Sequence, residues 1–400
     1  MTTFAFHRPA TAQAHRAPGW RQRAVQALLL VAGVSASVWV GAASRTYTST
    51  ADFNEGVSVG ISTVDGKLSL SITGSTFPVL WVANAGEDSL SKFDTRLNKE
   101  VARYRTWFGP SGQAGYVNHL GSAYSGAAPS RTAVDVDGNA YVLNRHFDGR
   151  SATLVKILSN SFIDRNGNGV ADTSADANAD GLIQSGEMKP MADTNGNGII
   201  DASEIQDERV AWAVRVPDGG PGFPIKSGQL GRSLCIAPNG ELWVGLYYEQ
   251  TYYRVRASDG KTLQGPINVG TTPYGCLIDA AGKLWSADLG SSMARLDTNT
   301  GVASPPVPTF DANYGIAIDN NYVYLGSYAN NTYVRINKAT SVVDKPAAVK
   351  FYTLGLSVDG TGAIVTGGPG GGDGVTRFNA ATGAVICSNV GQGLSDARGV

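Results

Sequence analysis

The feature that most restricts the fold of this chain is a Lys or Arg followed by an apolar residue, which recurs six times. The copies are Lys92-Phe93, Lys156-Ile157, Arg254-Val255, Arg295-Leu296, Arg335-Ile336 and Arg377-Phe378. The last four follow one another at intervals of about 40 residues. A fixed period of this length indicates a chain built from repeated supersecondary units.

A second signal precedes five of these pairs. It is a short apolar strand, a turn containing Gly or Asn, and a strand rich in aromatic or β-branched residues. The copies are DVDGNAYVLN (135–144), IAPNGELWVGL (236–246), LIDAAGKLWSAD (277–288), AIDNNYVYLGS (317–327) and SVDGTGAIVTGG (357–368). Each unit continues through the basic pair and a turn such as Thr298-Asn299-Thr300-Gly301 into a fourth strand. The pattern predicts an all-β fold, a β-propeller of six or seven four-stranded blades over residues 57–390.

The two ends of the pattern are less regular. The first unit is expected to use KLSLSI (67–72), FPVLWVAN (77–84), SLSKFD (89–94) and EVARYRTW (100–107) as its four strands. Residues 391–400 are interpreted as either the start of a further blade or a tail, and residues 57–61 as a candidate closing strand. The number of blades, six or seven, stays open at this point.

The N-terminal segment has the pattern of an export signal. Arg8, Arg16, Arg21 and Arg23 precede an uncharged stretch from Ala24 to Ser44, and Val40-Gly41-Ala42 fits a small-residue cleavage site. We therefore predict a signal peptide over residues 1–42 and a secreted or cell-surface protein. An uncleaved signal anchor is the alternative, because the apolar stretch approaches the length of a membrane-spanning helix.

The charge balance bears on the partner. Lys and Arg number 32 against 33 Asp and Glu, which gives a net charge of -1. Such a chain has no basic excess to neutralise phosphates, so nucleic acid is not expected as a partner. The three cysteines are predicted to be buried apolar residues. A bridge between Cys235 and Cys276 is not expected, because they are offset by one position in aligned copies.

Residues 158–209 form an insertion between the third and fourth strands of the second unit, and they contain the pattern of calcium-binding loops. Asp176 to Glu187 satisfies all twelve positions, with oxygen ligands at 1, 3 and 5, Gly at 6, a backbone carbonyl at 7, and Glu at 12. Asp193 to Glu204 repeats the pattern, whereas the loop beginning at Asp164 has Ala175 at position 12. The predicted Ca²⁺ ligands are Asp164, Asn166, Asn168, Val170, Asp172, Asp176, Asn178, Asp180, Leu182, Gln184, Glu187, Asp193, Asn195, Asn197, Ile199, Asp201 and Glu204.

These loops resemble EF-hand, dockerin and thrombospondin-type calcium repeats. Unlike paired EF-hands they follow one another too closely for full flanking helices. A structural clamp is therefore favoured over a calcium sensor. Because the insertion extends from one hairpin, few contacts of the propeller core are expected to depend on it.

The blade motif resembles that of virginiamycin B lyase-like and NHL-type propellers, G-I-A-x-D-x-x-G-x-[LV]-W-[VF] followed by [KR]-[IL]-D. The most similar copies are GIAIDNN (315–321) and GKLWSAD (282–288). The resemblance covers most of the chain after the N-terminal segment and implies the fold. The lyases use a catalytic His and a metal-holding Glu, but His119 and His146 stand in no matching context, so no catalytic residue and no organic cofactor is assigned.

Two functions from different classes remain open. The first is an exported, calcium-binding propeller that serves as a binding module for a glycan, peptide or protein. Tyr247, Tyr248, Tyr252 and Tyr253 are candidates for its contact surface, although half of them must face the sheet. The second is a metal-dependent lyase or lactonase at the channel mouth. The strand-end positions for such a site are Asn84, Asn144, Leu246, Asp288, Ser327 and Gly368, although Asn and Asp also cap turns there.

Overall fold

The computed structural model divides the chain into two compact units, Met1–Gly74 and Ser75–Val400. It describes residues 61–64, 67–70, 78–107, 126–195, 200–309, 311–330, 332–344, 353–359, 361–367 and 375–390. The signal segment 1–42, residues 57–60, His119, Asn197, Ile199, Gly368 and the tail 391–400 lie outside these ranges, so what the sequence predicts for them stays a prediction. In the described ranges, no helix has the length and apolar composition that crossing a membrane requires.

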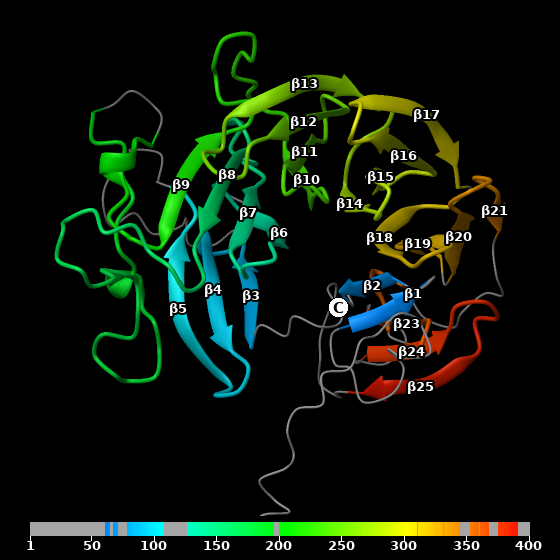
Figure 1. Cartoon of the computed structure of the whole chain (residues 1–400), viewed down its shortest axis with the longest axis horizontal. Coiled ribbons are helices and arrows are strands. Elements are labelled where there is room, and N and C mark those ends of the chain that lie inside the picture. Colours follow the sequence, from blue (N-terminus) through cyan, green and yellow to red (C-terminus); the bar gives the residue numbers. More distant parts are fainter. Residues whose placement is uncertain are drawn as a thin grey trace, which may run out of the picture. The chain divides into compact units, whose positions relative to one another are not determined.

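The unit Ser75–Val400 is a β-propeller, as the repeat predicts, and it has six blades where the repeat left six or seven open. Contacts join β3 with β6, β6 with β10, β10 with β14, β14 with β18, and β18 with β22, and Figure 1 shows these sheets following one another around an axis. The strands of blades one to three are β3 (Val79–Asn84), β4 (Ser89–Asp94) and β5 (Lys99–Arg105); β6 (Pro129–Val134), β7 (Ala140–Asn144), β8 (Thr153–Ile157) and β9 (Val210–Arg215); β10 (Gly231–Ile236), β11 (Leu242–Leu246), β12 (Thr251–Val255) and β13 (Thr262–Asn268).

The strands of blades four to six follow the same antiparallel order. They are β14 (Gly275–Ile278), β15 (Lys283–Ala287), β16 (Ser292–Asp297) and β17 (Val302–Pro308); β18 (Asn313–Ile318), β19 (Tyr322–Ser327), β20 (Tyr333–Asn337) and β21 (Val343–Asp344); β22 (Gly355–Val358), β23 (Ala363–Gly367), β24 (Val375–Asn379) and β25 (Val385–Val390). The prediction of four strands for each of units two to six is confirmed.

The first blade differs from the prediction. Among the described residues its sheet has three strands, and the segment expected to be its innermost strand forms β2 (Lys67–Leu70), which pairs with β1 (Ile61–Val64) in a separate two-stranded sheet. The register runs from Ile61 with Leu70 to Val64 with Lys67, so in this segment local antiparallel pairing prevails over the repeat pattern.

The core lies between the blades. Successive strand residues point to opposite faces of a sheet, so each strand contributes to two interfaces. In β11, Leu242 and Val244 pack in the interface with blade two, whereas Trp243 packs in the interface with blade four. This alternation fixes which side chains of neighbouring blades can meet.

The basic residue of the repeat has a structural role within this arrangement. It pairs in register with the bulky residue of the preceding strand, as in Trp81 with Lys92 and Tyr141 with Lys156. The Lys92 ammonium lies 5.5 Å from the Trp81 ring centroid and donates a hydrogen bond to the carbonyl of Ser159. The side chain thus packs on an aromatic ring and donates a hydrogen bond to the neighbouring blade, which is a structural role.

A disulfide joins Cys235 of β10 to Cys276 of β14, with Cα atoms 6.0 Å apart, so the prediction of no bridge is wrong. The offset of one position permits the bridge. The side chain of Cys235 faces the fourth blade and that of Cys276 faces the third, so both lie in the shared interface. Cys387 is exposed, which corrects the expectation that it is buried.

Candidate functional site

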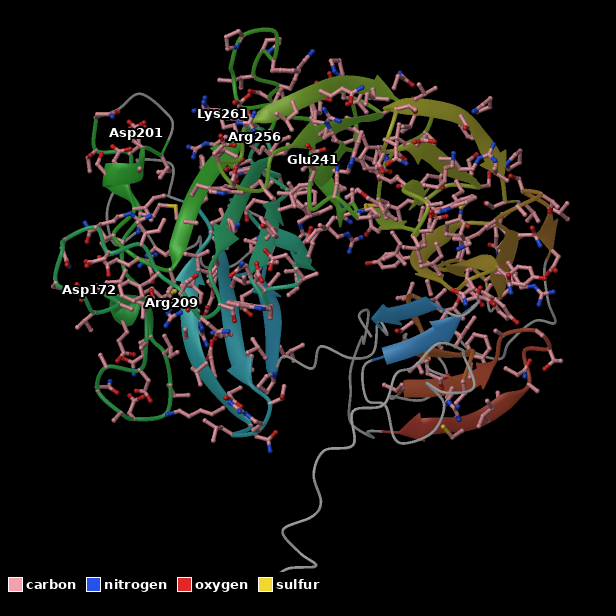
Figure 2. All side chains as sticks on the ribbon, in the orientation of Figure 1. Asp172, Asp201, Arg209, Glu241, Arg256 and Lys261 are labelled. Atoms are coloured by element: carbon pink, nitrogen blue, oxygen red, sulfur yellow. A yellow bond between two sulfur atoms is a disulfide. The ribbon has the colours of Figure 1, made fainter. Side chains whose placement is uncertain are left out.

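The insertion that contains the predicted calcium loops begins after β8 ends at Ile157 and ends before β9 starts at Val210. It has two short 3-10 helices, η1 (Ser185–Glu187) and η2 (Ala202–Glu204), each of which begins one residue after position 9 of a predicted loop. Figure 2 shows Asp172 and Asp201 on loops at the periphery of the blades, away from the central axis.

Both complete loops are closed by the glutamate at position 12. Glu187 accepts hydrogen bonds of 2.9 Å from the backbone N–H of Ala177, at position 2, and of Gln184, at position 9. Glu204 accepts the equivalent bonds, 2.6 Å from Thr194 and 2.9 Å from Asp201. The N–H of Asp201 is the largest of the influences that hold the pKa of Glu204 below its usual range.

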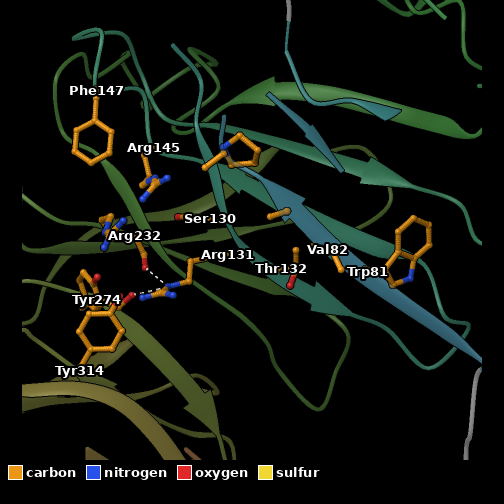
Figure 3. Close-up of a pocket in the computed structure, with 13 residues that line it drawn as sticks. Trp81, Val82, Ser130, Arg131, Thr132, Arg145, Phe147, Arg232, Tyr274 and Tyr314 are labelled. Atoms are coloured by element: carbon orange, nitrogen blue, oxygen red, sulfur yellow. Dashed lines mark hydrogen bonds between the residues drawn. The ribbon is translucent and has the colours of Figure 1, made fainter. Parts of the chain in front are cut away.

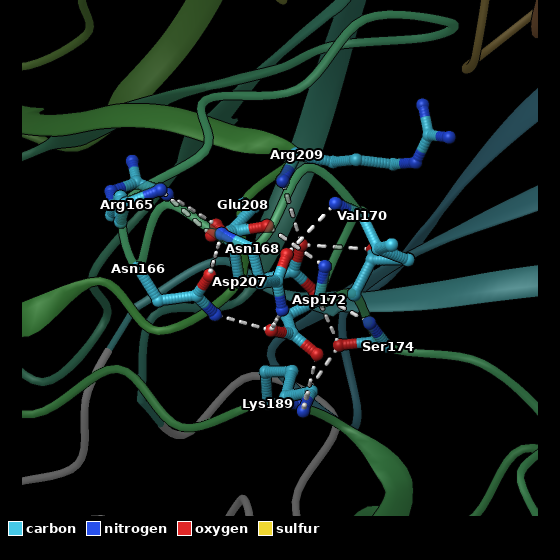
Figure 4. A network of polar contacts seen from close by, with 11 residues as sticks. Arg165, Asn166, Asn168, Val170, Asp172, Ser174, Lys189, Asp207, Glu208 and Arg209 are labelled. Carbon is cyan, nitrogen blue, oxygen red and sulfur yellow. Dashed lines mark hydrogen bonds and ion pairs between the residues drawn. The ribbon is translucent and has the colours of Figure 1, made fainter.

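The first loop has the same closure, but its glutamate comes from elsewhere in the chain. The Glu208 carboxylate accepts a hydrogen bond of 2.7 Å from the N–H of Arg165, at position 2, and one of 2.8 Å from the N–H of Asp172, at position 9 (Figure 4). Ala175, at position 12, has no carboxylate to offer. Glu208 therefore takes the place that Glu187 and Glu204 take in their own loops.

Sequence analysis missed Glu208 because the twelve-residue loop pattern that begins at Asp164 ends at Ala175, well before Glu208. Its carboxylate is only 2 % exposed, and neighbouring Asp207 is buried as well. Asp207 accepts hydrogen bonds from the hydroxyl of Thr173 and from the N–H and hydroxyl of Ser174. These three hydrogen bonds hold Asp207 beside the end of the first loop, and thereby place the neighbouring Glu208 against that loop. An acidic pair directly before the last strand of the blade is the one signal that the sequence offers.

The remaining loop positions adopt the expected backbone. Asp164 and Asp176, at position 1, accept hydrogen bonds from the N–H groups at positions 5 and 6. Gly169 and Gly181, at position 6, have φ of 75° and 91°, which only glycine adopts without strain. A Cβ at either glycine would meet nothing within 4 Å, so the backbone angle and not space requires glycine there.

The donor chemistry of the loops suits a hard cation. Carboxylate and amide oxygens of Asp176, Asn178, Asp180 and Glu187 belong to one loop, and the Leu182 side chain is 67 % exposed, as expected where a residue contributes its carbonyl. Val170 is likewise 65 % exposed. Among the described residues, no three Asp, Glu, His or Cys side chains converge as a metal-ligand group.

The insertion contributes to the core, contrary to the expectation that few core contacts depend on it. Met191, Ile200 and Ile205 are 2 %, 7 % and 2 % exposed and belong to the apolar cluster between blades one and two. The insertion also reaches β5, because Lys99 forms a 3.1 Å ion pair with Asp176 and Arg105 donates to the carbonyl of Ser185. Apolar residues within the loops make the insertion a bridge between two blades.

The strand-end residues of the lactonase alternative are engaged within and next to their own hairpins. Asn84 donates to the hydroxyls of Ser89 and Ser91. Asn144 donates to the carbonyl of Thr106 and to the hydroxyl of Thr153.

Asp288 and His146, which follow the second strands of their blades, are likewise held by hydrogen bonds to neighbouring residues. Asp288 accepts bonds from Thr271, Gly290, Ser292 and Asn313, while its burial raises its pKa. His146 is 1 % exposed and lies 2.9 Å from the hydroxyl of Thr153. None of these side chains is among the residues that line the channel cavity described next.

A cavity of about 720 Å³ lies at the propeller axis (Figure 3). Its walls come from β3, β6 and β10, from the segments around Arg145 and Tyr274, and from β18. The charged residues that line it are Arg131, Arg145 and Arg232, and aromatic rings of Tyr274 and Tyr314 complete one wall. Sequence analysis did not identify this site, although an arginine near the start of the innermost strand in two neighbouring units is a visible signal.

The tyrosine cluster of residues 247–253 is divided between core and surface. Tyr252 and Tyr253 are 0 % and 1 % exposed, and the Tyr252 hydroxyl contacts those of Ser233 and Ser286. Only Tyr248, which is 62 % exposed, has the exposure expected of a contact surface. Half of the four tyrosines were expected to face the sheet, and the structure places Tyr252 and Tyr253 in the interfaces on either side of β12.

No model of a known family and no curated protein matches this chain. Similar solved structures include virginiamycin B lyase from Staphylococcus aureus, 14% identical over 68% of this chain and 73% of that one, with a TM-score of 0.44. A streptogramin B lyase is 12% identical over 75% and 80%, with a TM-score of 0.44. The computationally designed Ika8 protein is 10% identical over 80% and 74%, with a TM-score of 0.45.

Proposed function

We propose that this protein is an exported, calcium-binding β-propeller that acts as a binding module at the cell surface or outside the cell. The observation that carries the calcium proposal is the closure of three loops by Glu187, Glu204 and Glu208, each bonded to the N–H groups at positions 2 and 9. Glu208 makes the same closure although it comes from outside the loop that it closes. This supports the proposal, because bidentate ligation of one ion requires a glutamate at this place in every loop.

Calcium would be held by the oxygens of positions 1, 3, 5, 7 and 12 and would neutralise carboxylates that otherwise repel one another. Ile200 and Ile205 lie next to ligands of the last loop and are buried between blades one and two. Ordering of this loop would therefore stabilise the blade interface. The metal has a structural role in this proposal and takes part in no reaction.

Export is supported by two features. The disulfide between Cys235 and Cys276 is of a kind that persists in oxidising compartments. The N-terminal pattern of residues 1–42 is that of a signal peptide, and millimolar extracellular calcium would fill even weak loops.

Expression of the whole chain in a bacterial host tests the proposed export, with N-terminal sequencing of the exported fraction. An unprocessed chain that stays in the cytoplasm would contradict export.

Calorimetric titration tests the calcium proposal. Protein freed of metal by chelation should take up three ions per chain, and Glu187→Gln and Glu204→Gln should each remove one. Glu241→Gln is the matched control, because Glu241 lies outside the insertion, in an ion pair with Arg254. Absence of heat on calcium addition, or equal uptake by all four proteins, would show that the loops are not calcium sites.

A further inference from the structure

The cavity at the propeller axis has an unusual balance of charge. Three of the side chains that line it are arginines, and among the described lining residues there is no Asp or Glu. The six blades contribute many ion pairs elsewhere, for example between Arg335 and Asp344. The axis therefore concentrates positive charge in a chain whose net charge is only -1.

Arg131 is held in place by the backbone of two other blades. Its Nε donates hydrogen bonds of 3.0 Å to the carbonyls of Arg232 and Tyr274. Its guanidinium carbon lies 4.7 Å from the Tyr274 ring centroid. The two terminal nitrogens donate to no acceptor among the described residues, and they remain available as a planar pair of donors.

Arg232 is buried with no counter-ion in the described part of the chain. It is 9 % exposed, and its guanidinium carbon lies 4.2 Å from the same Tyr274 ring. No described carboxylate lies within ion-pair distance of it, and its side chain donates no hydrogen bond to the described part of the chain. Burial is the main influence that lowers the pKa of Arg232, and the charge of Arg131 lowers it further.

Such an arrangement gives the cavity positive charge that the described residues do not neutralise. A guanidinium removed from water loses its hydration, and the interaction with an aromatic ring replaces only part of it. Two like charges on one ring add repulsion. An anion between them would relieve both effects, so the cavity is complementary to a negative charge.

The aromatic wall indicates what carries that charge. Tyr274 lies edge to face with Tyr314, at 5.1 Å between ring centroids, and Tyr314 continues to Tyr328 at 6.3 Å. On its other side Tyr274 approaches Tyr247 at 6.4 Å. A row of rings next to two arginines offers apolar contact to the body of a small molecule, and the volume of the cavity is within the range of small-molecule sites.

We propose that the axial cavity binds the oxyanion group of a small organic molecule, with Arg131 and Arg232 as the anion ligands and Tyr274 and Tyr314 as the contact for its body. The shared chemistry is that of carboxylate, phosphate or sulfate. The inference deepens the binding-module proposal by naming the ligand class, and it is independent of calcium.

Calorimetric titration of the whole chain with four probes that share one ring tests the proposal. The probes are benzoate, phenyl phosphate, phenyl sulfate and the neutral benzyl alcohol, with inorganic phosphate as a fifth. At least one ring-bearing anion should bind ten or more times more tightly than benzyl alcohol and more tightly than inorganic phosphate, and which one does so identifies the oxyanion. Equal binding of the neutral and anionic probes, or no binding of any, overturns the proposal.

Variants of Arg232 separate binding from folding. Arg232→Met should weaken the preferred anion at least tenfold, and its unfolding midpoint in a chloride buffer should equal or exceed that of the parent. Arg232→Lys should retain part of the binding. The control is Arg335→Met, because Arg335 also stacks on a ring, 4.7 Å from Tyr322, but is paired with Asp344.

Arg335→Met should leave anion binding unchanged and lower the midpoint. If Arg232→Met fails to fold, or melts well below the parent, Arg232 is a structural residue and the proposal is wrong. Calcium uptake by the same samples reports separately on the insertion, so failure of the anion site is distinguishable from failure of the calcium proposal.

Discussion

The carboxylate of Glu208 accepts a hydrogen bond of 2.8 Å from the backbone N–H of Asp172, which precedes it by 36 residues. Through this contact a loop without a closing glutamate of its own obtains one from the chain that leaves the insertion. We expect Glu208→Gln to remove one bound calcium ion from the total and to leave the sites closed by Glu187 and Glu204 intact, because an amide cannot bind the ion with two carboxylate oxygens.

Calorimetry with the Glu208→Gln protein measures this directly, and Glu241→Gln again serves as the control. A second variant guards against a purely structural effect. Glu208→Asp keeps the charge but shortens the reach, and it should weaken the same site without removing it. Unchanged stoichiometry in Glu208→Gln would mean that the first loop binds no ion.

Removal of calcium should loosen the interface of blades one and two. Ile200 and Ile205 of the insertion are buried there, and Lys99 of β5 pairs with Asp176. Hydrogen exchange followed by mass spectrometry should therefore show faster exchange in β5 and β9 after chelation, with no change in β15 and β16 of the fourth blade. Uniform acceleration across all blades, or a change limited to the loops themselves, would contradict the bridging role.

The repeat was sufficient to predict the blades because each copy has the same pattern of strand and turn residues. Strand, turn and basic pair recur at a fixed period, so errors in one copy are corrected by the others. Predictions that depended on one copy were less secure. The segment of β2 pairs locally with β1, and the offset of Cys235 and Cys276 matters between neighbouring sheets and not within one sheet.

The sites were predictable to different degrees for the same reason. Two calcium loops are contiguous, so their ligands are visible as a motif. Glu208 reaches its loop only through the folded insertion. Arg131 and Arg232 meet because the innermost strands β6 and β10 of neighbouring blades face the same axis, and their separation of about a hundred residues has no meaning in a linear pattern. Long-range convergence of this kind requires the structure.

The disulfide should contribute strongly to stability. Cys235 and Cys276 are 41 residues apart, and closing a loop of this length restricts the unfolded chain by about 4 kcal/mol in the chain-entropy description. The double variant with alanine at both positions should lose about 3–4 kcal/mol in denaturant unfolding. Cys387→Ala, at an exposed position, is the control and should change nothing. Equal stability of all three proteins would exclude a native bridge.

The indole N–H of buried Trp243 offers a test in which a substitution should increase stability. Asp279 accepts a hydrogen bond of 3.1 Å from the indole N–H of Trp285, and the equivalent residue of the preceding blade is Ala237. The indole N–H of Trp243 consequently has no partner in the described structure. Ala237→Asp should raise the free energy of unfolding by about 1 kcal/mol, whereas Asp279→Ala should lower it by about 2 kcal/mol. Denaturant titration of both proteins decides, and destabilisation by Ala237→Asp would show that burial of the carboxylate outweighs the new bond.

The ammonium of Lys92 should make stability depend on pH in the alkaline range. Burial, and then the charge of Arg209, lowers its pKa from 10.5 to about 8. Between pH 8 and 10 the unfolded chain therefore binds a proton that the folded chain has released, and the free energy of unfolding rises with pH. Relative to Lys92→Met, the parent should gain about 0.5–1 kcal/mol per pH unit in this window, a range that allows for partial exposure to solvent, and gain nothing below pH 7. Denaturant unfolding of both proteins at pH 7, 8, 9 and 10 measures the difference. Parallel curves would mean that Lys92 keeps its ordinary pKa in the folded protein.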